Sequence, residues 1–111
     1  MKASEIIKHA LKFYVREEDE NNSNLCVYMC HAIEFNAASI GADFNDMVNA
    51  RAHVYEFLDK YSCGTIHVAL CRSDRRYLSY SRRYGFHSNA CYSRRVKWFN
   101  ELVAGLESEG L

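Results

Sequence analysis

The 111 residues include no proline, so the residue that most often interrupts a helix is absent throughout the chain. Glycine, asparagine and serine are left to mark the ends of elements. No apolar run approaches the roughly eighteen residues that span a bilayer, and the first fifteen residues carry charges rather than the apolar stretch of a signal peptide. These absences predict a soluble, cytoplasmic protein that is rich in helix and has no membrane partner.

Sequence motifs of enzymes are also missing. The chain has no glycine-flanked nucleophile, no paired-carboxylate motif and no glycine-rich loop that could cradle a phosphate. With five cysteines and five histidines, one pair will lie close by chance, and proximity alone does not make a nucleophile. We therefore expect that the protein is not an enzyme and uses no cofactor.

The cysteines are odd in number and irregular in spacing, so they do not define a disulfide framework. In a cytoplasmic chain they are expected to be free and mostly buried thiols. A metal site is the alternative, because Cys63, His67 and Cys71 are spaced four residues apart and would align along one helix. Cys26 and Cys30 also lie one helical turn apart. Since no C-x-x-C pair occurs, buried thiols are the preferred interpretation.

Length and composition describe one folded unit. A chain of this size forms a single domain, here residues 1–111. Hydrophobic residues make up 49% and charged residues 25% of the chain, as in a globular protein. The formal net charge is zero, so copies do not repel one another and self-association is expected to be possible.

Apolar stripes at helical spacing predict helices over residues 4–15, 25–40 and 44–61, and from about Ser93 onward. Ser4 is expected to cap the first helix, Gly41 to take the left-handed position after the second, and Asp43 or Asn45 to cap the third. The tail after Gly105 is expected to fray. The inward residues of the third helix are predicted to be Phe44, Met47, Val48, Tyr55, Leu58 and Tyr61.

Residues 65–71 fit two interpretations. Alternating apolar residues favour a strand, whereas a helix accounts for more of the residues up to Gly85. The fold class that we predict is all-α, a compact single-domain bundle of four to five helices. Its core is expected to contain Ile7, Leu11, Cys30, Ile33, Met47, Tyr55, Leu58, Leu70, Phe99, Leu102 and Val103.

The charge is distributed unevenly along the chain. Residues 72–97 hold eight basic side chains against one acid and carry a net charge of +7, whereas residues 1–71 carry −4 and residues 98–111 carry −3. Arginines alternate with tyrosines here, a combination typical of binding surfaces. The predicted partner-binding residues are Arg72, Arg75, Arg76, Tyr77, Tyr80, Arg82, Arg83 and Tyr84.

Three interpretations of this basic segment stay open. Its charge could be solvated or neutralised inside the molecule by the acids of residues 17–20 and of the third helix. It could bind a protein with an acidic surface, through steering and charge-assisted contacts. It could also bind nucleic acid, although no named nucleic-acid motif is present. We prefer a non-enzymatic protein-interaction module and keep nucleic-acid binding as the alternative.

Several segments resemble small helical proteins of tailed bacteriophages. They are the short N-terminal helix, the apolar run LCVYMCHAI, the run TIHVALC and the ending RRVKWFNELV. The resemblance implies a protein made in the host cytoplasm during infection that binds and modulates a host protein. It provides no catalytic residue.

Overall fold

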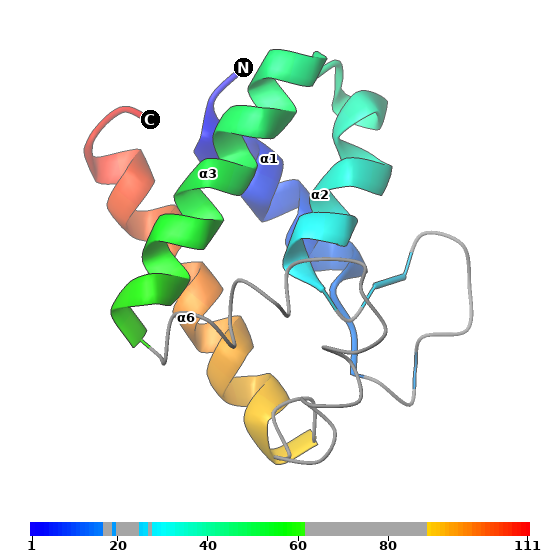
Figure 1. The fold of residues 1–111 in the computed structure, drawn as a ribbon, viewed down its shortest axis with the longest axis vertical. Coiled ribbons are helices and arrows are strands. Elements are labelled where there is room, and N and C mark those ends of the chain that lie inside the picture. The colour runs from blue at the N-terminus through cyan, green and yellow to red at the C-terminus, as the bar shows by residue number, and fades with distance from the viewer. Residues whose placement is uncertain (17–18, 20–24, 27, 62–88) are drawn as a thin grey trace.

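The computed structural model describes residues 1–16, 19, 25–26, 28–61 and 89–111 (Figure 1). These residues form four α-helices and two short 3-10 helices and contain no strand, which confirms the all-α prediction. None of the described helices is long and apolar enough to cross a membrane. The elements are α1 (Ala3–Ala10), η1 (Leu11–Phe13), α2 (Met29–Asn36), η3 (Ala37–Ile40), α3 (Phe44–Tyr61) and α6 (Asn89–Ser108).

The short helix α1 is the centre of the fold and packs against α2, α3 and α6. Figure 1 shows it lying behind α3, with α2 on one side and α6 on the other. Ile6 and Ile7 are both at most 1% exposed, because neighbours surround the helix on more than one side. Ser4 is itself buried within α1 and Lys2 takes the N-cap position, so the predicted Ser4 cap is wrong.

An isolated parallel bridge between Tyr14 and Cys26 corrects the predicted end of the first helix and the predicted start of the second. The Cys26 amide donates to the Phe13 carbonyl at 2.9 Å, and the Val15 amide donates to the Cys26 carbonyl at 3.0 Å. These bonds hold both segments extended, since a backbone amide cannot serve a helix and a bridge at once. Consequently α1 passes into η1 before residue 15, and α2 begins at Met29 rather than at residue 25.

Glycine ends two helical segments, as predicted for the first of them. Gly41 follows η3 with a φ of 85°, and Gly110 follows α6 with a φ of 75°. At each site the glycine amide and the next amide turn back onto the last carbonyls of the helix, which is the Schellman arrangement. The chain after Gly105 therefore stays helical to Ser108, and the prediction that this tail frays is wrong.

The start of α3 was predicted correctly. The Asp43 side chain accepts a hydrogen bond from the Asp46 amide at 2.8 Å, and the Asp46 side chain accepts one from the Asp43 amide at 3.2 Å. This reciprocal pair is a capping box with aspartate in both positions. Asp43, and not Asn45, is the N-cap.

The inward face of α3 differs from the prediction. Phe44 is 72% exposed and Val48 is 42% exposed, so the prediction that both point inward is wrong. The fully buried residues among the described side chains of α3 are Ala50 and Val54, both 0% exposed. Met47 and Tyr55 pack at the edge of the core and are partly buried.

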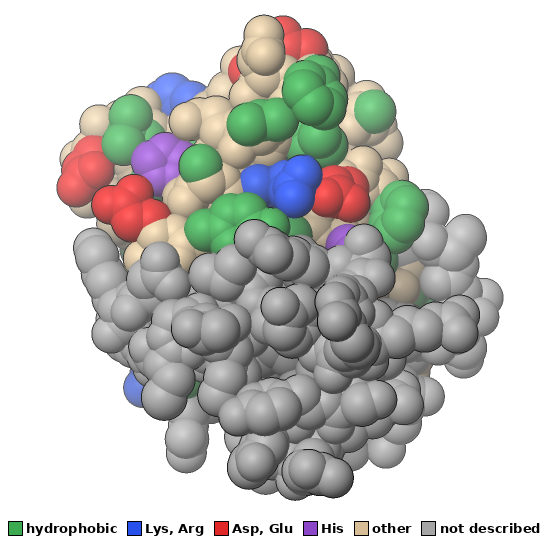
Figure 2. All heavy atoms as spheres, in the orientation of Figure 1, with side chains coloured by type: hydrophobic (Ala, Val, Ile, Leu, Met, Phe, Trp, Pro, Cys, Tyr) green, Lys and Arg blue, Asp and Glu red, His purple; other side chains and the backbone are tan. Residues whose placement is uncertain are grey.

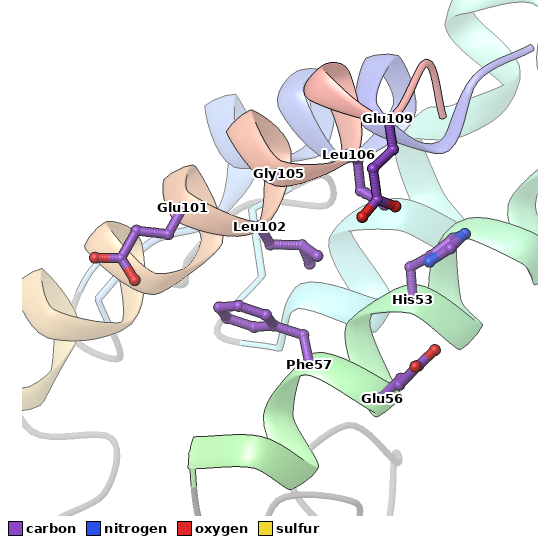
Figure 3. A pocket seen from close by; sticks show the side chains of 8 residues that line it. All are labelled: His53, Glu56, Phe57, Glu101, Leu102, Gly105, Leu106 and Glu109. Atoms are coloured by element: carbon purple, nitrogen blue, oxygen red, sulfur yellow. The ribbon is translucent and has the colours of Figure 1, made fainter.

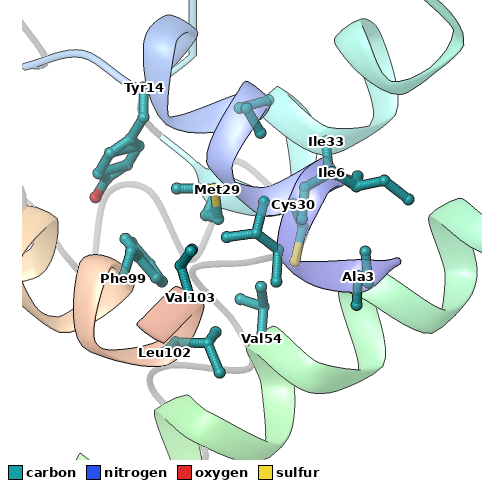
Figure 4. Packing of buried hydrophobic residues seen from close by; sticks show 14 of the residues in the cluster. Ala3, Ile6, Tyr14, Met29, Cys30, Ile33, Val54, Phe99, Leu102 and Val103 are labelled. Carbon is teal, nitrogen blue, oxygen red and sulfur yellow. The ribbon is translucent and has the colours of Figure 1, made fainter. Parts of the chain in front are cut away.

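The core gathers side chains from all four α-helices (Figure 4). The apolar stripe of α6 is confirmed in Phe99, Leu102, Val103 and Leu106, although α6 begins at Asn89 and not near Ser93. Leu11 is only partly buried, while Ile6, missing from the prediction, is fully enclosed. The predicted core residues that are buried are Ile7, Cys30, Ile33, Phe99, Leu102 and Val103.

Candidate protein-interaction site

The predicted partner-binding residues, Arg72 to Tyr84, lie outside the described residues. So do the candidate metal ligands Cys63, His67 and Cys71, the segment 65–71 and the predicted core residue Leu70. The structure also does not describe the side chains of Leu58 and Tyr61. Within the basic segment 72–97, it describes the side chains of Tyr92, Ser93, Arg95, Val96 and Lys97.

Arg95 lies inside the fold. Its side chain is 3% exposed, and its Nε donates a hydrogen bond to the Tyr14 hydroxyl at 2.6 Å. The guanidinium carbon also lies 5.9 Å from the centre of the Tyr14 ring. One of the eight positive charges of the basic segment is therefore internal and joins the second turn of α6 to Tyr14 at the end of η1. It is not part of a surface that could steer a partner.

Tyr92 forms a stack at the edge of the same cluster. Its hydroxyl donates to the Tyr14 carbonyl at 2.8 Å, and the two rings stack with centres 5.5 Å apart. The guanidinium of the exposed Arg16 lies 5.3 Å from the centre of the Tyr92 ring. Cation–π contact holds the planar Arg16 group against an aromatic face, a geometry that suits carboxylate recognition. Arg16 lies outside the predicted helices, and no sequence signal connects it with Tyr92.

A second surface lies on the outer sides of α2 and α3. We define the α2–α3 outer face by Phe35, Phe44, Val48, Arg51 and Tyr55, together with Glu34 beside Arg51. Phe35 is 60% exposed and joins Phe44 and Val48 as a large apolar side chain in contact with solvent. Figure 2 shows hydrophobic side chains gathered around charged ones on the side of the molecule that carries α3.

Arg51 is held in a fixed position at the middle of the α2–α3 outer face. Its Nη1 lies 3.0 Å from Oε1 of Glu34, and its Nη2 donates to the Tyr55 hydroxyl at 3.2 Å. Partial burial disfavours the Arg51 charge, but the Tyr55 hydroxyl and the Glu34 carboxylate outweigh it and raise the pKa of Arg51 above its ordinary value. Its Nε is buried without a hydrogen-bond partner.

Aromatic contacts continue along α2 next to this face. The His31 ring lies edge-on to Phe35, with centres 6.0 Å apart, and edge-on to Tyr28, with centres 5.2 Å apart. The row fixes the orientation of Phe35 although most of that side chain is in solvent. A positioned aromatic ring loses little conformational entropy when a partner covers it.

A cleft of about 310 Å³ separates the outer parts of α3 and α6. Figure 3 shows Phe57 and Leu102 pointing toward each other between the two helices, with His53 and Glu109 at one end and Glu101 turned away at the other. The carboxylates are spread along the cleft and do not converge on one point. Among the described residues, no group of three or more histidines, cysteines and acids is placed to hold a metal ion.

The described cysteines agree with the prediction of buried thiols. Cys26 is 3% exposed, Cys30 is 0% exposed, and neither forms a disulfide among the described residues. Cys30 packs in the core with the apolar residues of α1 and α2. Thiols in this environment behave as small hydrophobic groups.

Sequence comparisons do not add a family. No protein-family model, no curated protein and no solved structure matches this chain.

Proposed function

We propose that this protein is a non-enzymatic protein-interaction module that binds a partner with an acidic surface through its basic, tyrosine-rich segment. The observation that carries the proposal is the charge partition, with +7 in residues 72–97 of a chain whose formal net charge is zero. Arginine binds carboxylates through paired hydrogen bonds and stacks on tyrosine, so this composition suits an acidic protein surface.

Two described residues of the segment, and Arg16 outside it, support this proposal in part. Lys97 is exposed on α6, and the exposed Arg16 lies against the ring of Tyr92, so Arg16 adds a positive charge next to the segment. Arg95 is removed from the surface by its bond to Tyr14, which lowers the charge left for a partner. In line with the resemblance to phage proteins, the proposed partner is a protein of a bacterial host, which binding would modulate in the host cytoplasm.

A matched pair of charge reversals tests the proposal. Arg75→Glu with Arg83→Glu changes the charge inside the segment, and Lys2→Glu with Lys12→Glu makes the same total change on exposed lysines elsewhere. Circular dichroism first confirms that both variants fold. Proteins captured from a nuclease-treated bacterial lysate are identified, purified and titrated against the wild type and both variants.

We expect the segment variant to weaken binding to the purified partner by at least about tenfold, while the lysine variant changes it by less than about threefold. Equal losses in both variants would show that total charge, and not the segment, drives binding. Capture of nucleic acid alone, abolished by nuclease, would overturn the proposal in favour of nucleic-acid binding.

A further inference from the structure

We propose that the α2–α3 outer face is the interface at which two copies of this chain form a two-fold symmetric dimer. This inference concerns residues other than the basic segment, so it stands or falls separately from the proposed partner binding. Its chemistry is that of a self-complementary surface with an ion pair inside an apolar patch.

The apolar part of the face is large and has no cover from the described residues. Of the five large hydrophobic residues that are exposed among the described residues, Phe35, Phe44 and Val48 lie on this face. Phe44 and Val48 are one turn apart on α3, and Arg51 and Tyr55 continue the same side of the helix. An exposed apolar stripe of this kind, in addition to the stripe that faces the core, is typical of a helix that packs against neighbours on two sides.

The ion pair makes the face complementary to itself. Arg51 and Glu34 lie side by side at 3.0 Å, each about one-third exposed, with 29% and 32% of their side chains in solvent. A two-fold axis brings the same surface of each copy together. Each contact between a residue of one copy and a different residue of the other therefore occurs twice, once in each direction. Arg51 of one copy can then face Glu34 of the other, and the four charges alternate in sign.

Composition also favours an interface here. Arginine, tyrosine and phenylalanine are enriched in protein interfaces and lysine is depleted, and residues 13–59 contain no lysine at all. Arg51 is already held by Glu34 and Tyr55, so little side-chain freedom is lost when a second surface covers it.

The charge of the face selects a second copy over the acidic partner proposed above. One arginine and one glutamate cancel, so the face has no net attraction for an acidic protein. Two copies also carry no net charge and do not repel each other.

The first test compares two new aspartates on the same helix. Phe44→Asp places a charge in the proposed interface at the first position of α3, where an acid is favourable to the helix. Asn49→Asp places the same charge on the exposed side of α3 away from the face. Sedimentation velocity from about 1 to 300 µM measures the dimer dissociation constant of each protein.

We expect a wild-type dimer, a dimer of normal affinity in Asn49→Asp, and an affinity at least about tenfold weaker in Phe44→Asp. A wild type that stays monomeric over the whole range would overturn the proposal, as would a dimer that Phe44→Asp leaves intact. Binding of this face to a different protein by a monomeric wild type would overturn it as well.

A charge exchange tests the two-fold arrangement itself. Arg51→Glu gives a face with two acids and Glu34→Arg gives one with two arginines, so each variant alone should dimerise at least about tenfold more weakly than the wild type. An equimolar mixture should recover dimers, because each acidic face now meets a basic one. Two variants that each stay monomeric when mixed, with both confirmed as folded, would rule out this pairing.

Discussion

The two sides of α3 show that side-chain size did not decide which side was buried. The side toward the core carries Ala50 and Val54, both 0% exposed, and a second side of the helix carries Phe44 at 72% and Val48 at 42% exposure. The separation of packed helices depends on the side chains at their contact, and small residues let α3 approach the central helix closely. The larger side chains of Phe44 and Val48 are then left exposed among the described residues. The following predictions test that contrast, beginning with the largest effect.

A pair of phenylalanines compares the core with the outer face directly. Phe99→Ala should lower the free energy of unfolding by about 3–5 kcal/mol, because Phe99 is 2% exposed and its ring packs edge-on to Tyr14. Phe44→Ala should change it by less than about 0.5 kcal/mol in dilute, monomeric protein. Urea unfolding measures both values. A loss below about 1 kcal/mol for Phe99→Ala would show that α6 is wrongly oriented.

The same comparison between a buried and an exposed residue can be made with two smaller side chains, the valines of α3. Val54→Ala removes two carbons from a fully enclosed site and should cost about 2 kcal/mol, which includes the small cavity left behind. Val48→Ala should stay within about 0.5 kcal/mol. Thermal and urea unfolding at low protein concentration give both numbers. Equal losses at the two positions would remove the distinction between the inner and outer sides of α3.

Replacing glycine by alanine should change the free energy of unfolding in opposite directions at a turn and inside a helix. Gly41→Ala should destabilise the fold by about 1 kcal/mol, because its φ of 85° disfavours any residue with a Cβ. Gly105→Ala should stabilise it by about 0.5–1 kcal/mol, since Gly105 is within α6 and a Cβ there meets nothing within 4 Å. Unfolding curves of the two variants give the sign of each change in the free energy of unfolding. The Gly41 variant tests the turn that precedes α3. A stabilising Gly41→Ala would contradict the left-handed turn.

The smallest expected effect is a pH dependence at the first turn of α3. Hydrogen bonds from the Asp43 amide and the Met1 ammonium hold the pKa of Asp46 below its ordinary value of 3.8. A carboxyl whose pKa is lowered on folding stabilises the protein fully above its unfolded pKa and loses that contribution as pH falls through the folded pKa. The difference in unfolding free energy between wild type and Asp46→Asn should therefore shrink below pH 3.8. A difference that is constant from neutral to strongly acidic pH would exclude this contribution.

The all-α class, the bounds of α3, the Gly41 turn and the α6 stripe were predictable from the sequence, since local patterns define them. The bridge between Tyr14 and Cys26 was not, because it depends on pairing between distant segments. The inner side of α3 was misassigned because the helix has two apolar stripes, and the one with larger residues was chosen. Only the neighbouring helix α1 shows that the smaller stripe is buried. The exposed stripe of larger residues was the sequence signal that could have identified the α2–α3 outer face. The predicted site at residues 72–84 stays a prediction.

Solvent relaxation of valine methyl groups tests the contrast most directly. A soluble paramagnetic reagent broadens the NMR signals of exposed methyl groups in a protein labelled at valine, and the measurement is made at low and at high protein concentration. We predict that the Val48 methyl signals broaden at low concentration and become protected at high concentration, whereas the Val54 signals stay sharp at both. Broad Val54 signals at low concentration, or Val48 signals protected at every concentration, would contradict the assignment of the two sides of α3. Val48 signals that stay broad at high concentration would contradict the dimer.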